Sequence, residues 1–547
     1  MLFFLFCLTL MSVDNRWAQA EILLIRMLPS ICVLAMLVLL LRRENLRLTQ
    51  GDLLLSLFAL YYLLHSSLSS KYPCATQCLR LTGVFLLYIS LRFVFSARDI
   101  PQWVLVSLLL LCGSIEAVWG IVQLAGGGSR AQVFMLTGNF NNPGPYSAYL
   151  AIGVVTGLAF MVERGRNKIV FLVVALLLAV IPSTWSRAAF ISVVIPVLWL
   201  FRDQYYRYRY VVWGVLIILA VAIYFVKKGS ADGRLVIWIA SLLSWRYSAL
   251  TGVGTGGFAH SCSEGIAEMY NSGLFSSILD SAGVAENAFN IFLKILVEQG
   301  MVGLILFLLA LTVILKGLYS SSRPLFYGFL TLLLFSMFSY PLELLPYRII
   351  AITTVAWSES TKSKAFSLKC NGFIAIPVLG IVFVAGMFLR KEAYDRYSAD
   401  KEARLLSCQT GEDILDDYYD ILDYEEDNQH FLYDFSVALS ENGSFQESNT
   451  ILGMGIKVSA DPMFYVLSGN NYSNLNMPEQ AEEAYLKAFY VLPNRIYPLY
   501  QLMSLYSETD QEERAKNVAD EILKISPKVA SPATDEMKEM AKQILLR

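Results

Sequence analysis

Long apolar segments separated by short polar ones fill the first 390 residues of the chain. A helix needs about 20 apolar residues to cross the hydrocarbon layer of a bilayer, and several segments fall short of this length or abut a neighbour. The pattern therefore predicts twelve to thirteen membrane helices. The predicted segments are 2–13, 19–41, 52–68, 79–97, 102–124, 146–163, 168–185, 188–201, 210–227, 289–316, 324–339, 341–357 and 371–389.

One stretch of this membrane part departs from the pattern. Residues 228–288 contain only short apolar runs. Unpaired backbone in hydrocarbon is costly, so such a loop must be solvated or packed on protein. We expect the chemistry of the protein at this loop, with the membrane helices holding it in place.

The pattern changes again from residue 391, where a polar helical part begins. Its small, aromatic and proline positions recur after 34 residues, which is the period of tetratricopeptide repeats. The positions are Gly469, Tyr472, Ala481, Ala488 and Pro493, followed by Tyr506, Ala515 and Pro527, with a weaker copy at 431–461. Stacked repeats present a concave groove, so this part is either a structural cap or a docking site for a protein partner or acceptor.

The predicted fold class is therefore all-α, with a polytopic membrane bundle at 1–390 and a soluble α-solenoid at 391–547. Of the 547 residues 56% are hydrophobic and only 16% are charged, against about 25% charged in soluble domains. The net charge of −2 argues against a nucleic-acid partner. Membrane lipids are the expected surroundings.

Basic residues in the short loops predict the orientation of the bundle, because cytoplasmic loops carry an excess of Lys and Arg. The basic positions on alternate loops are Arg42, Arg43, Arg47, Arg92, Arg98, Arg164, Arg166, Lys168, Arg202, Arg207, Arg209, Lys362 and Lys364. The loops 125–145 and 228–288 and the turn at Trp185 then face outward. With thirteen crossings the C-terminal part also lies outside, which is the periplasm if the membrane is the inner membrane of a Gram-negative bacterium.

Two sets of polar residues on this outer side are candidates for chemistry. Asn139, Asn141 and Asn142 precede an apolar segment that opens with Pro143. They indicate either a capped re-entry loop or a polar lining for a sugar or a diphosphate.

Arginines form the second set. Arg187 lies at a membrane edge, where a charge marks a functional site by default, although snorkelling to the interface is an alternative. Arg234 opens the long loop, and two guanidiniums grip a diphosphate without a metal. Arg246 and Arg348 are further candidates on the same side.

Other signals are weak. The glycine run 252–257 lacks the Gly-Lys-Ser/Thr ending of a phosphate-binding loop and is expected to be a flexible turn. His65, His260 and His430 are far apart, so neither a metal site nor a cofactor is expected. Cys74 and Cys78 share a loop and would pair if that loop is extracytoplasmic.

Together these residues carry a resemblance to a known family. The order Gly138-Asn-Phe-Asn-Asn, Ser186-Arg187, Arg234 with Trp238, Gly254-Thr-Gly-Gly-Phe, and Asn290 followed at nine residues by Gly300-Met-Val-Gly303 resembles the O-antigen ligase superfamily. That superfamily includes lipopolysaccharide O-antigen ligases, Wzy-type polymerases and protein O-oligosaccharyltransferases. The resemblance implies transfer of a glycan from an undecaprenyl-diphosphate carrier, without a metal, on the periplasmic side. By matching position, Arg187 and Arg234 would hold the donor diphosphate.

One position departs from the family pattern. The motif usually begins with a histidine followed by Asn, Ser or Gln, and here Phe289 stands before Asn290. Glu286 lies three residues earlier, which would be one helical turn on the same face. We expect Glu286 to replace the histidine as base. The alternative is a carboxylate that answers the dipole of a helix start.

The leading hypothesis is an inverting, metal-independent glycosyltransferase of the cell envelope that acts in lipopolysaccharide biosynthesis. Its acceptor would be a lipid A–core sugar, a growing glycan or a protein hydroxyl. Two hypotheses from other classes stay open, namely a transporter of a small anion and an inert scaffold that recruits an envelope assembly. Transport would be favoured by inverted repeats with broken helices, which the sequence does not display.

Overall fold

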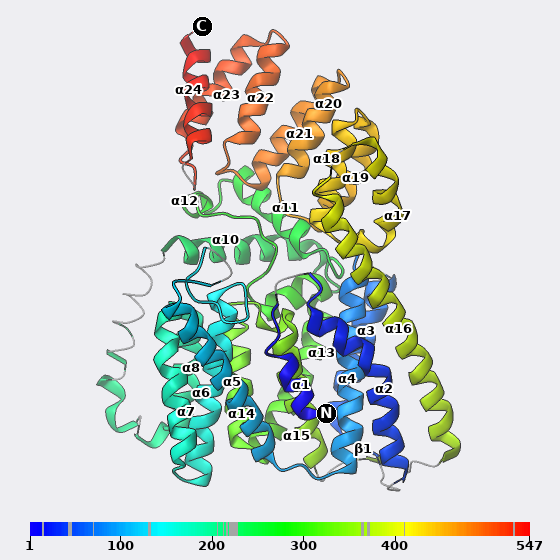
Figure 1. Cartoon of the computed structure of the whole chain (residues 1–547). Helices are drawn as coiled ribbons and strands as arrows, with labels where there is room; N and C mark the ends of the chain where they lie inside the picture. The colour runs from blue at the N-terminus through cyan, green and yellow to red at the C-terminus, as the bar shows by residue number, and fades with distance from the viewer. Residues whose placement is uncertain are drawn as a thin grey trace.

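The computed structural model describes residues 1–13, 16–41, 46–68, 70–129, 133–204, 206–211, 213–214, 217, 228–362, 366–368, 372–409, 411–528 and 531–546. Apolar helices form one bundle, and the C-terminal helices stand at one end of it (Figure 1). The helices of the long outer loop lie between these two parts. The all-α architecture predicted from the sequence is confirmed.

Six of the described helices are long and apolar enough to cross a membrane, so the chain is a multi-pass membrane protein. They are α2 (Gln19–Leu41), α3 (Gln50–Leu68), α4 (Ala75–Ala97), α5 (Gln102–Ala125), α6 (Pro143–Arg164) and α13 (Ile291–Ser321). Shorter apolar helices join them: α7 (Lys168–Val180) with the 3-10 turn η1 (Ile181–Thr184), α8 (Arg187–Leu200) and α14 (Arg323–Phe335).

This number is smaller than the predicted twelve to thirteen spans. The segment 2–13 contains only the seven-residue helix α1 (Leu2–Leu8), which is about 10 Å long and too short to span. The predicted span 341–357 divides into η3 (Pro341–Glu343) and α15 (Leu345–Thr361). The predicted span 210–227 lies mostly outside the described residues, as do Arg42, Arg43 and Lys364.

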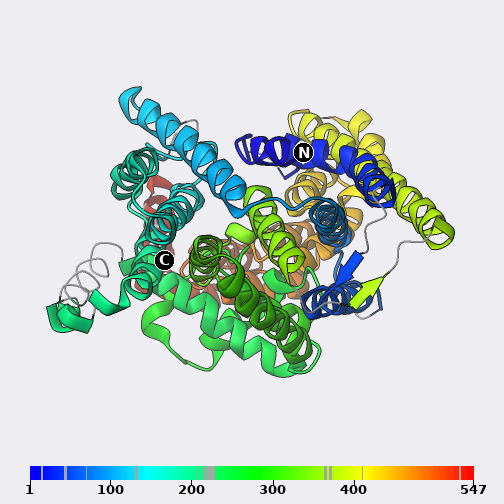
Figure 2. The same cartoon turned by 90° about the horizontal axis from the view of Figure 1, so that it is seen from below.

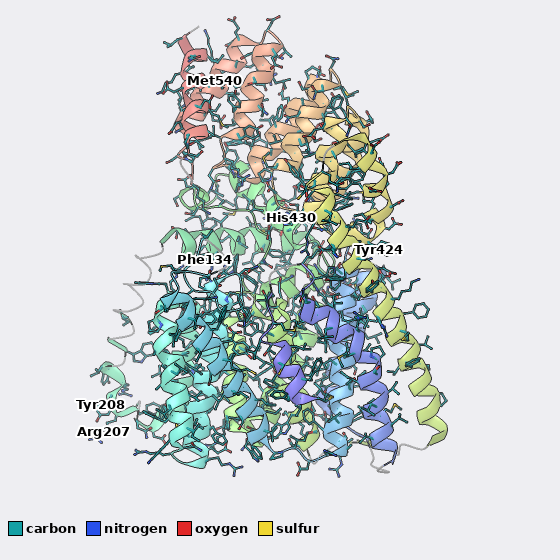
Figure 3. All side chains as sticks on the ribbon, in the orientation of Figure 1. Phe134, Arg207, Tyr208, Tyr424, His430 and Met540 are labelled. Atoms are coloured by element: carbon teal, nitrogen blue, oxygen red, sulfur yellow. The ribbon has the colours of Figure 1, made fainter. Side chains whose placement is uncertain are left out.

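One basic residue assigned to a loop lies inside a helix instead. Arg92 belongs to α4 and is buried, and its Nε donates to Oδ1 of Asp52 on α3 at 2.8 Å. This ion pair satisfies a charge that would otherwise be costly in an apolar bundle. Figure 3 shows Arg207 at the end of the molecule opposite to the C-terminal helices, and the orientation in the membrane stays a prediction.

The centre of the bundle is built by α6, α14 and α15. Figure 2, viewed from below, shows the green helices of the α13–α15 region in the middle, with blue and cyan helices around them. Tyr146 and Tyr149 of α6 and Tyr347 of α15 are fully buried there. Two short strands, β1 (Leu46–Leu48) and β2 (Phe366–Leu368), pair antiparallel beside this bundle.

Helix α13 is broken at Gly300, where φ is 65° and ψ is −169°. The break frees backbone groups, and the glycine loop at 249–254 satisfies them. Val253 N donates to Val297 O at 2.9 Å and Gly254 N to Glu298 O at 3.0 Å, while Met301 N donates to Ala249 O at 3.0 Å. The glycine run is thus a fixed partner of α13 rather than a flexible turn.

The long outer loop folds into helices of its own. They are α10 (Lys228–Trp245), η2 (Arg246–Ser248), α11 (Phe258–Asn271) and α12 (Ser276–Leu279). Buried residues of α10, α11 and α13 share one apolar core with Ala460 and Leu492 of the C-terminal part. The loop is therefore packed on protein on both sides.

The C-terminal part consists of stacked helices. They are η4 (Glu412–Ile414), α17 (Leu415–Glu425), α18 (Gln429–Glu441), α19 (Phe445–Val458), α20 (Met463–Asn474), α21 (Pro478–Val491), α22 (Tyr497–Glu508), α23 (Glu512–Lys524) and α24 (Pro532–Leu546). Helices α18, α20 and α22 begin 34 residues apart, at 429, 463 and 497. The period agrees with the repeat read in the sequence, and its assignment as tetratricopeptide stays a prediction.

A single helix joins the two parts. Helix α16 (Gly372–Leu406) has 35 residues and continues through residue 391, where the composition changes. Figure 1 shows it running along the bundle and on into the C-terminal helices. The boundary expected between 390 and 391 therefore falls inside a continuous helix.

Hydrogen bonds fix the C-terminal part on the outer loop and on the bundle. The Nδ2 of Asn494 donates to the carbonyls of Asp280 and Ala282, both at 2.9 Å, and Lys528 Nζ donates to that of Ser281 at 2.9 Å. Arg16, which precedes α2, forms ion pairs with Glu425 and Asp427. Tyr424 and His430, labelled in Figure 3, flank these two carboxylates in the chain and mark the junction.

Candidate functional site

Arg187 stands at the start of α8, at the membrane edge that faces the outer loop. Trp185 has a left-handed conformation with φ of 50°, and Ser186 caps the helix by accepting from Ala189 N at 3.3 Å. Arg187 is the first residue after this cap. The turn therefore fixes the direction in which the arginine leaves the bundle.

Arg234 comes from the outer loop and meets the same space. It lies on α10 one turn before Trp238, so both side chains share a face of that helix. Together with Arg187 they line a cavity of about 560 Å³, which we call the arginine cavity. Its other walls are apolar and include Ala188, Phe190, Ile191, Val194, Ile195, Leu235 and Phe338.

The two arginines bring two positive charges to the arginine cavity. In the part of the chain that the structure describes, neither guanidinium has a carboxylate partner. Burial lowers the pKa of Arg234, and the neighbouring charge of Arg187 lowers that pKa further. Both groups stay protonated at any physiological pH. Such a cavity attracts an anion that carries an apolar tail.

Phe289 supports Arg234 from below. The guanidinium carbon of Arg234 lies 5.2 Å from the centre of the Phe289 ring, and that ring lies 5.7 Å from Tyr340. Phe289 has φ of 50°, and Trp238 Nε1 donates to the neighbouring carbonyl of Ala288 at 3.0 Å. The position expected to hold the family histidine therefore carries a ring that supports an arginine through a cation–π contact.

Glu286 does not lie on the helix that the sequence predicted for it. Helix α13 begins only at Ile291, with Asn290 as its cap, so residues 286–289 are an irregular segment. The expected spacing of one helical turn between Glu286 and Phe289 is wrong for this reason. Glu286 is exposed, and its Oε1 accepts from Nε2 of Gln429 in the C-terminal part at 2.9 Å. Burial raises the pKa of Tyr340 most, the charge of Glu343 adds to this, and the charge of Glu286 adds a smaller part.

A second cavity lies between α3, α4, α13 and α15, with a volume of about 310 Å³. Three cations border it, and each has an acid partner: Arg80 Nε lies 3.0 Å and Arg348 Nη1 3.5 Å from Glu21 Oε1, while Lys294 Nζ lies 2.7 Å from Glu343 Oε1. We call it the paired-charge cavity. Its remaining lining is Phe58, Tyr62, Gln77, Leu81, Val84, Ile291, Ile295, Glu298, Gln299, Phe307 and Leu342.

One carboxylate borders both the paired-charge cavity and a small gap that leads toward the arginines. Glu343 lines the paired-charge cavity, and it also lines a gap together with Phe289, Asn290 and Tyr340. Phe289, which lines this gap, contacts Arg234, which lines the arginine cavity. The two cavities therefore approach each other at the start of α13.

The asparagines of the loop before α6 are bonded within the protein. Asn139 Nδ2 donates to Leu10 O at 2.8 Å and to Glu116 Oε1 at 2.9 Å, and Asn142 caps α6 by accepting from Gly144 N at 2.8 Å. Asn290 caps α13 by accepting from Phe292 N at 3.0 Å. These bonds favour the capped re-entry loop over a polar lining. Asn141 is exposed at the tip of this loop.

The further arginine candidates separate from the arginine cavity. Arg246 follows the last residue of α10, about 18 Å along the helix from Arg234, and pairs with Glu268 on α11. Arg348 belongs to the paired-charge cavity. Sequence reasoning passed over Arg80, Lys294 and Glu343, although Lys294 carries a charge within an apolar helix, which was a usable signal. Among the described residues no group of His, Cys, Asp and Glu is arranged to hold a metal ion.

Comparison with known proteins identifies one part of the chain. Residues 146–308 match the model of the family described as O-antigen ligase, and no curated protein matches the chain. The matched region runs from α6 to the first half of α13 and holds Arg187, Arg234 and Glu286. The resemblance read from the sequence is confirmed over this region. The match supports an O-antigen ligase-like or polymerase-like membrane enzyme that transfers glycosyl groups.

Proposed function

From its O-antigen ligase domain at residues 146–308, we propose that this membrane protein transfers a glycan from undecaprenyl diphosphate to an acceptor hydroxyl. The reaction takes place at the outer edge of the inner membrane, on the periplasmic side, and needs no metal ion. The observation that carries the proposal is the arginine cavity, where two guanidiniums that pair with no carboxylate of the described residues face one apolar space.

The arginine cavity suits both ends of a polyprenyl diphosphate. Guanidiniums bind phosphate oxygens in a fixed fork geometry, and Arg187 and Arg234 come from separate elements that approach the same point. The apolar side chains of α8 offer a surface for the polyprenyl chain next to them. As the sugar–phosphate bond breaks, negative charge grows on the diphosphate, and the two cations stabilise it.

The paired-charge cavity suits an acceptor better than a diphosphate. Each of its three cations already has a carboxylate, so a strongly anionic group finds little net attraction there. The same side chains offer many hydrogen-bonding atoms to hydroxyl groups. Phe58, Val84 and Phe307 make its deeper wall apolar. We place the acceptor in the paired-charge cavity. It would be a lipid A–core sugar, a growing glycan or a protein side chain.

The transfer step forms one bond and breaks another. The acceptor oxygen forms a bond to the anomeric carbon, the bond from that carbon to the diphosphate breaks, and the electron pair leaves with undecaprenyl diphosphate. The hydroxyl proton goes to a carboxylate. We assign this role to Glu286 rather than Glu343, because the Glu343 carboxylate is already paired with the Lys294 ammonium at 2.7 Å.

A deletion strain assayed for lipid-linked glycan tests the proposal. Accumulation of undecaprenyl-linked polymer is expected for a ligase, and accumulation of single repeat units for a polymerase. Lipid-linked intermediates that match those of the parent strain would contradict a transferase and favour the transporter or scaffold hypothesis.

Purified variants test the site itself. Arg187→Ala and Arg234→Ala should each reduce transfer by about 100-fold or more, as removal of one charge-stabilising donor does in other enzymes. Arg246→Ala is the matched control, because Arg246 lies at the far end of α10 and should leave transfer unchanged. Glu286→Gln should remove transfer while undecaprenyl diphosphate still binds, and full activity of this variant would reject Glu286 as the base.

A further inference from the structure

A third cavity lies outside the bundle, between the outer loop and the C-terminal helices. Helix α11 forms one wall, and α21, α22 and α23 form the others, enclosing about 610 Å³. We call it the tyrosine groove, because Tyr270, Tyr490 and Tyr506 line it. Figure 1 shows these helices on the side of α10 that faces away from the bundle. The C-terminal walls lie beyond the part that matches the O-antigen ligase family.

Aromatic rings from both parts of the chain meet in this groove. The Tyr270 ring of α11 is stacked on Tyr490 at 5.7 Å with an angle of 29° between the ring planes, and it lies 5.2 Å from Phe489 with the rings edge to face. Tyr506 lies against the guanidinium of Arg514, 4.2 Å from the ring centre. Flat aromatic surfaces of this kind suit the apolar faces of sugar rings.

The polar groups of the groove are paired with one another. Arg514 Nη1 donates to Glu482 Oε2 at 2.9 Å, and the Tyr270 hydroxyl donates to Glu521 Oε1 at 3.1 Å. Burial and the adjacent carboxylates raise the pKa of Tyr270 and of Tyr506 to about 12, so both phenols keep their protons. With one guanidinium and two carboxylates, the groove disfavours anions and offers hydrogen bonds to neutral hydroxyls.

We propose that the tyrosine groove binds the uncharged sugar chain of the donor, at a distance from the diphosphate end that the arginine cavity holds. This inference rests on the proposed function, because it supposes a donor whose glycan extends into water from the membrane edge. The charges of the two sites are complementary to the two ends of such a molecule. A peptide is the other candidate occupant, and it is less favoured because one wall of the groove belongs to the glycan-transferring part of the chain.

A binding experiment on the full chain in lipid nanodiscs tests the proposal. The probe is the oligosaccharide released by mild acid from the lipid-linked pool of the source cells, followed by saturation-transfer NMR. Wild-type protein and Arg187→Ala should bind it equally. Tyr490→Ala should weaken binding at least tenfold, and Tyr490→Phe, which keeps the ring, should restore it. Tyr500→Ala, on α22 but outside the groove, is the matched control.

The outcomes separate this inference from the proposed function. Binding lost in Tyr490→Ala but kept in Arg187→Ala supports the groove as a sugar site, even if Arg187→Ala retains transfer activity. No saturation transfer to the released oligosaccharide from wild-type protein overturns the proposal. Binding that is unchanged in Tyr490→Ala also overturns it, because the sugar then lies elsewhere. Displacement of the oligosaccharide by a Ser/Thr-rich peptide, with tighter binding of the peptide, would assign the groove to a protein acceptor instead.

Discussion

A methyl group added to Gly300 would lie 2.5 Å from the backbone nitrogen of Gly252, and one added to Gly252 would lie 2.5 Å from the backbone nitrogen of Gly300. The break in α13 and the glycine loop therefore fit together only because neither position carries a side chain. This contact places the loop that follows α10 against the break inside α13, where Val297, Glu298 and Met301 exchange backbone hydrogen bonds with it.

Gly300→Ala should destabilise the protein by more than about 1–3 kcal/mol, the usual cost of a strained backbone, because overlap with the Leu250 carbonyl adds to it. The φ of 65° and ψ of −169° belong to a region that is almost reserved for glycine. Thermal unfolding in detergent measures the effect. Gly453→Ala in α19 is the control, because open space surrounds that position and its midpoint should not fall.

Phe289→Ala should weaken binding of undecaprenyl diphosphate roughly 2- to 30-fold, which corresponds to a lost cation–π contact of about 0.5–2 kcal/mol. The physical reason is that Arg234 loses the ring 5.2 Å beneath it and becomes free to turn out of the cavity. Isothermal titration gives the affinity. Phe292→Ala removes a nearby ring that contacts Phe307 instead, and equal losses in both variants would reject the assignment.

Asn494→Ala should loosen the segment 276–290 without unfolding the C-terminal helices. Its amide donates to the carbonyls of Asp280 and Ala282; Lys528 still donates to Ala282 in the variant, so the Asp280 carbonyl loses its bond, which contributes about 0.5–1.5 kcal/mol. Hydrogen exchange followed by mass spectrometry should show faster exchange in 276–290 alone. Gln501→Ala, which removes a bond within α22, should leave that segment as protected as in the wild type.

Oxidised glutathione should join Cys74 and Cys78 in a disulfide. Both thiols are free in the structure, and their sulfur atoms lie 3.9 Å apart. Cys74 precedes α4 and is not helical, which leaves room for the adjustment that a disulfide needs. Peptide mapping without reduction should find the cross-linked pair, whereas exposed Cys408 should carry a glutathione adduct. Two alkylatable thiols at 74 and 78 after oxidation would contradict this prediction.

Stability should fall as the pH rises from about 4.5 to about 7, in part because of Glu425. Burial raises the pKa of this carboxyl from 4.5 to about 7 in the folded chain, with Asp400 and Asp427 adding to the effect and Arg16 and Asn428 opposing it. The native state then binds more protons than the unfolded state in this window, so stability is lost with rising pH. Unfolding midpoints between pH 5 and 8 measure the slope, which Glu425→Gln should reduce.

The periodicity of the chain was sufficient to predict the helical bundle and the outer loop, because each depends on residues close in sequence. Predicted segments such as 188–201 and 324–339, which are shorter than a full span, form helices of 14 and 13 residues. The prediction also placed Glu286 on a helix. Asn290 caps α13, so the helix begins at Ile291, and an Asn directly before an apolar segment is a usable signal for such a start.

Contacts between distant segments were the part that the sequence did not indicate. Arg187 and Arg234 were paired through their position in a family pattern, and the structure brings them to one cavity. Nothing in the local sequence of Arg80 or Lys294 indicates that each meets an acid from another segment. The role of the glycine run, which is to bond the backbone of α13 at Gly300, is likewise visible only in the structure.

Because α16 is continuous, it fixes the rotation and the height of the C-terminal helices relative to the membrane bundle. One residue inserted near position 391 would turn the upper helices by about 100° and raise them by about 1.5 Å. Arg16 would then lose its acidic partners and Asn494 its carbonyls, although no contacting side chain had changed. The number of residues in α16 therefore determines whether the C-terminal helices reach their contacts. An insertion of one residue, which a surface loop would tolerate, would misplace these helices.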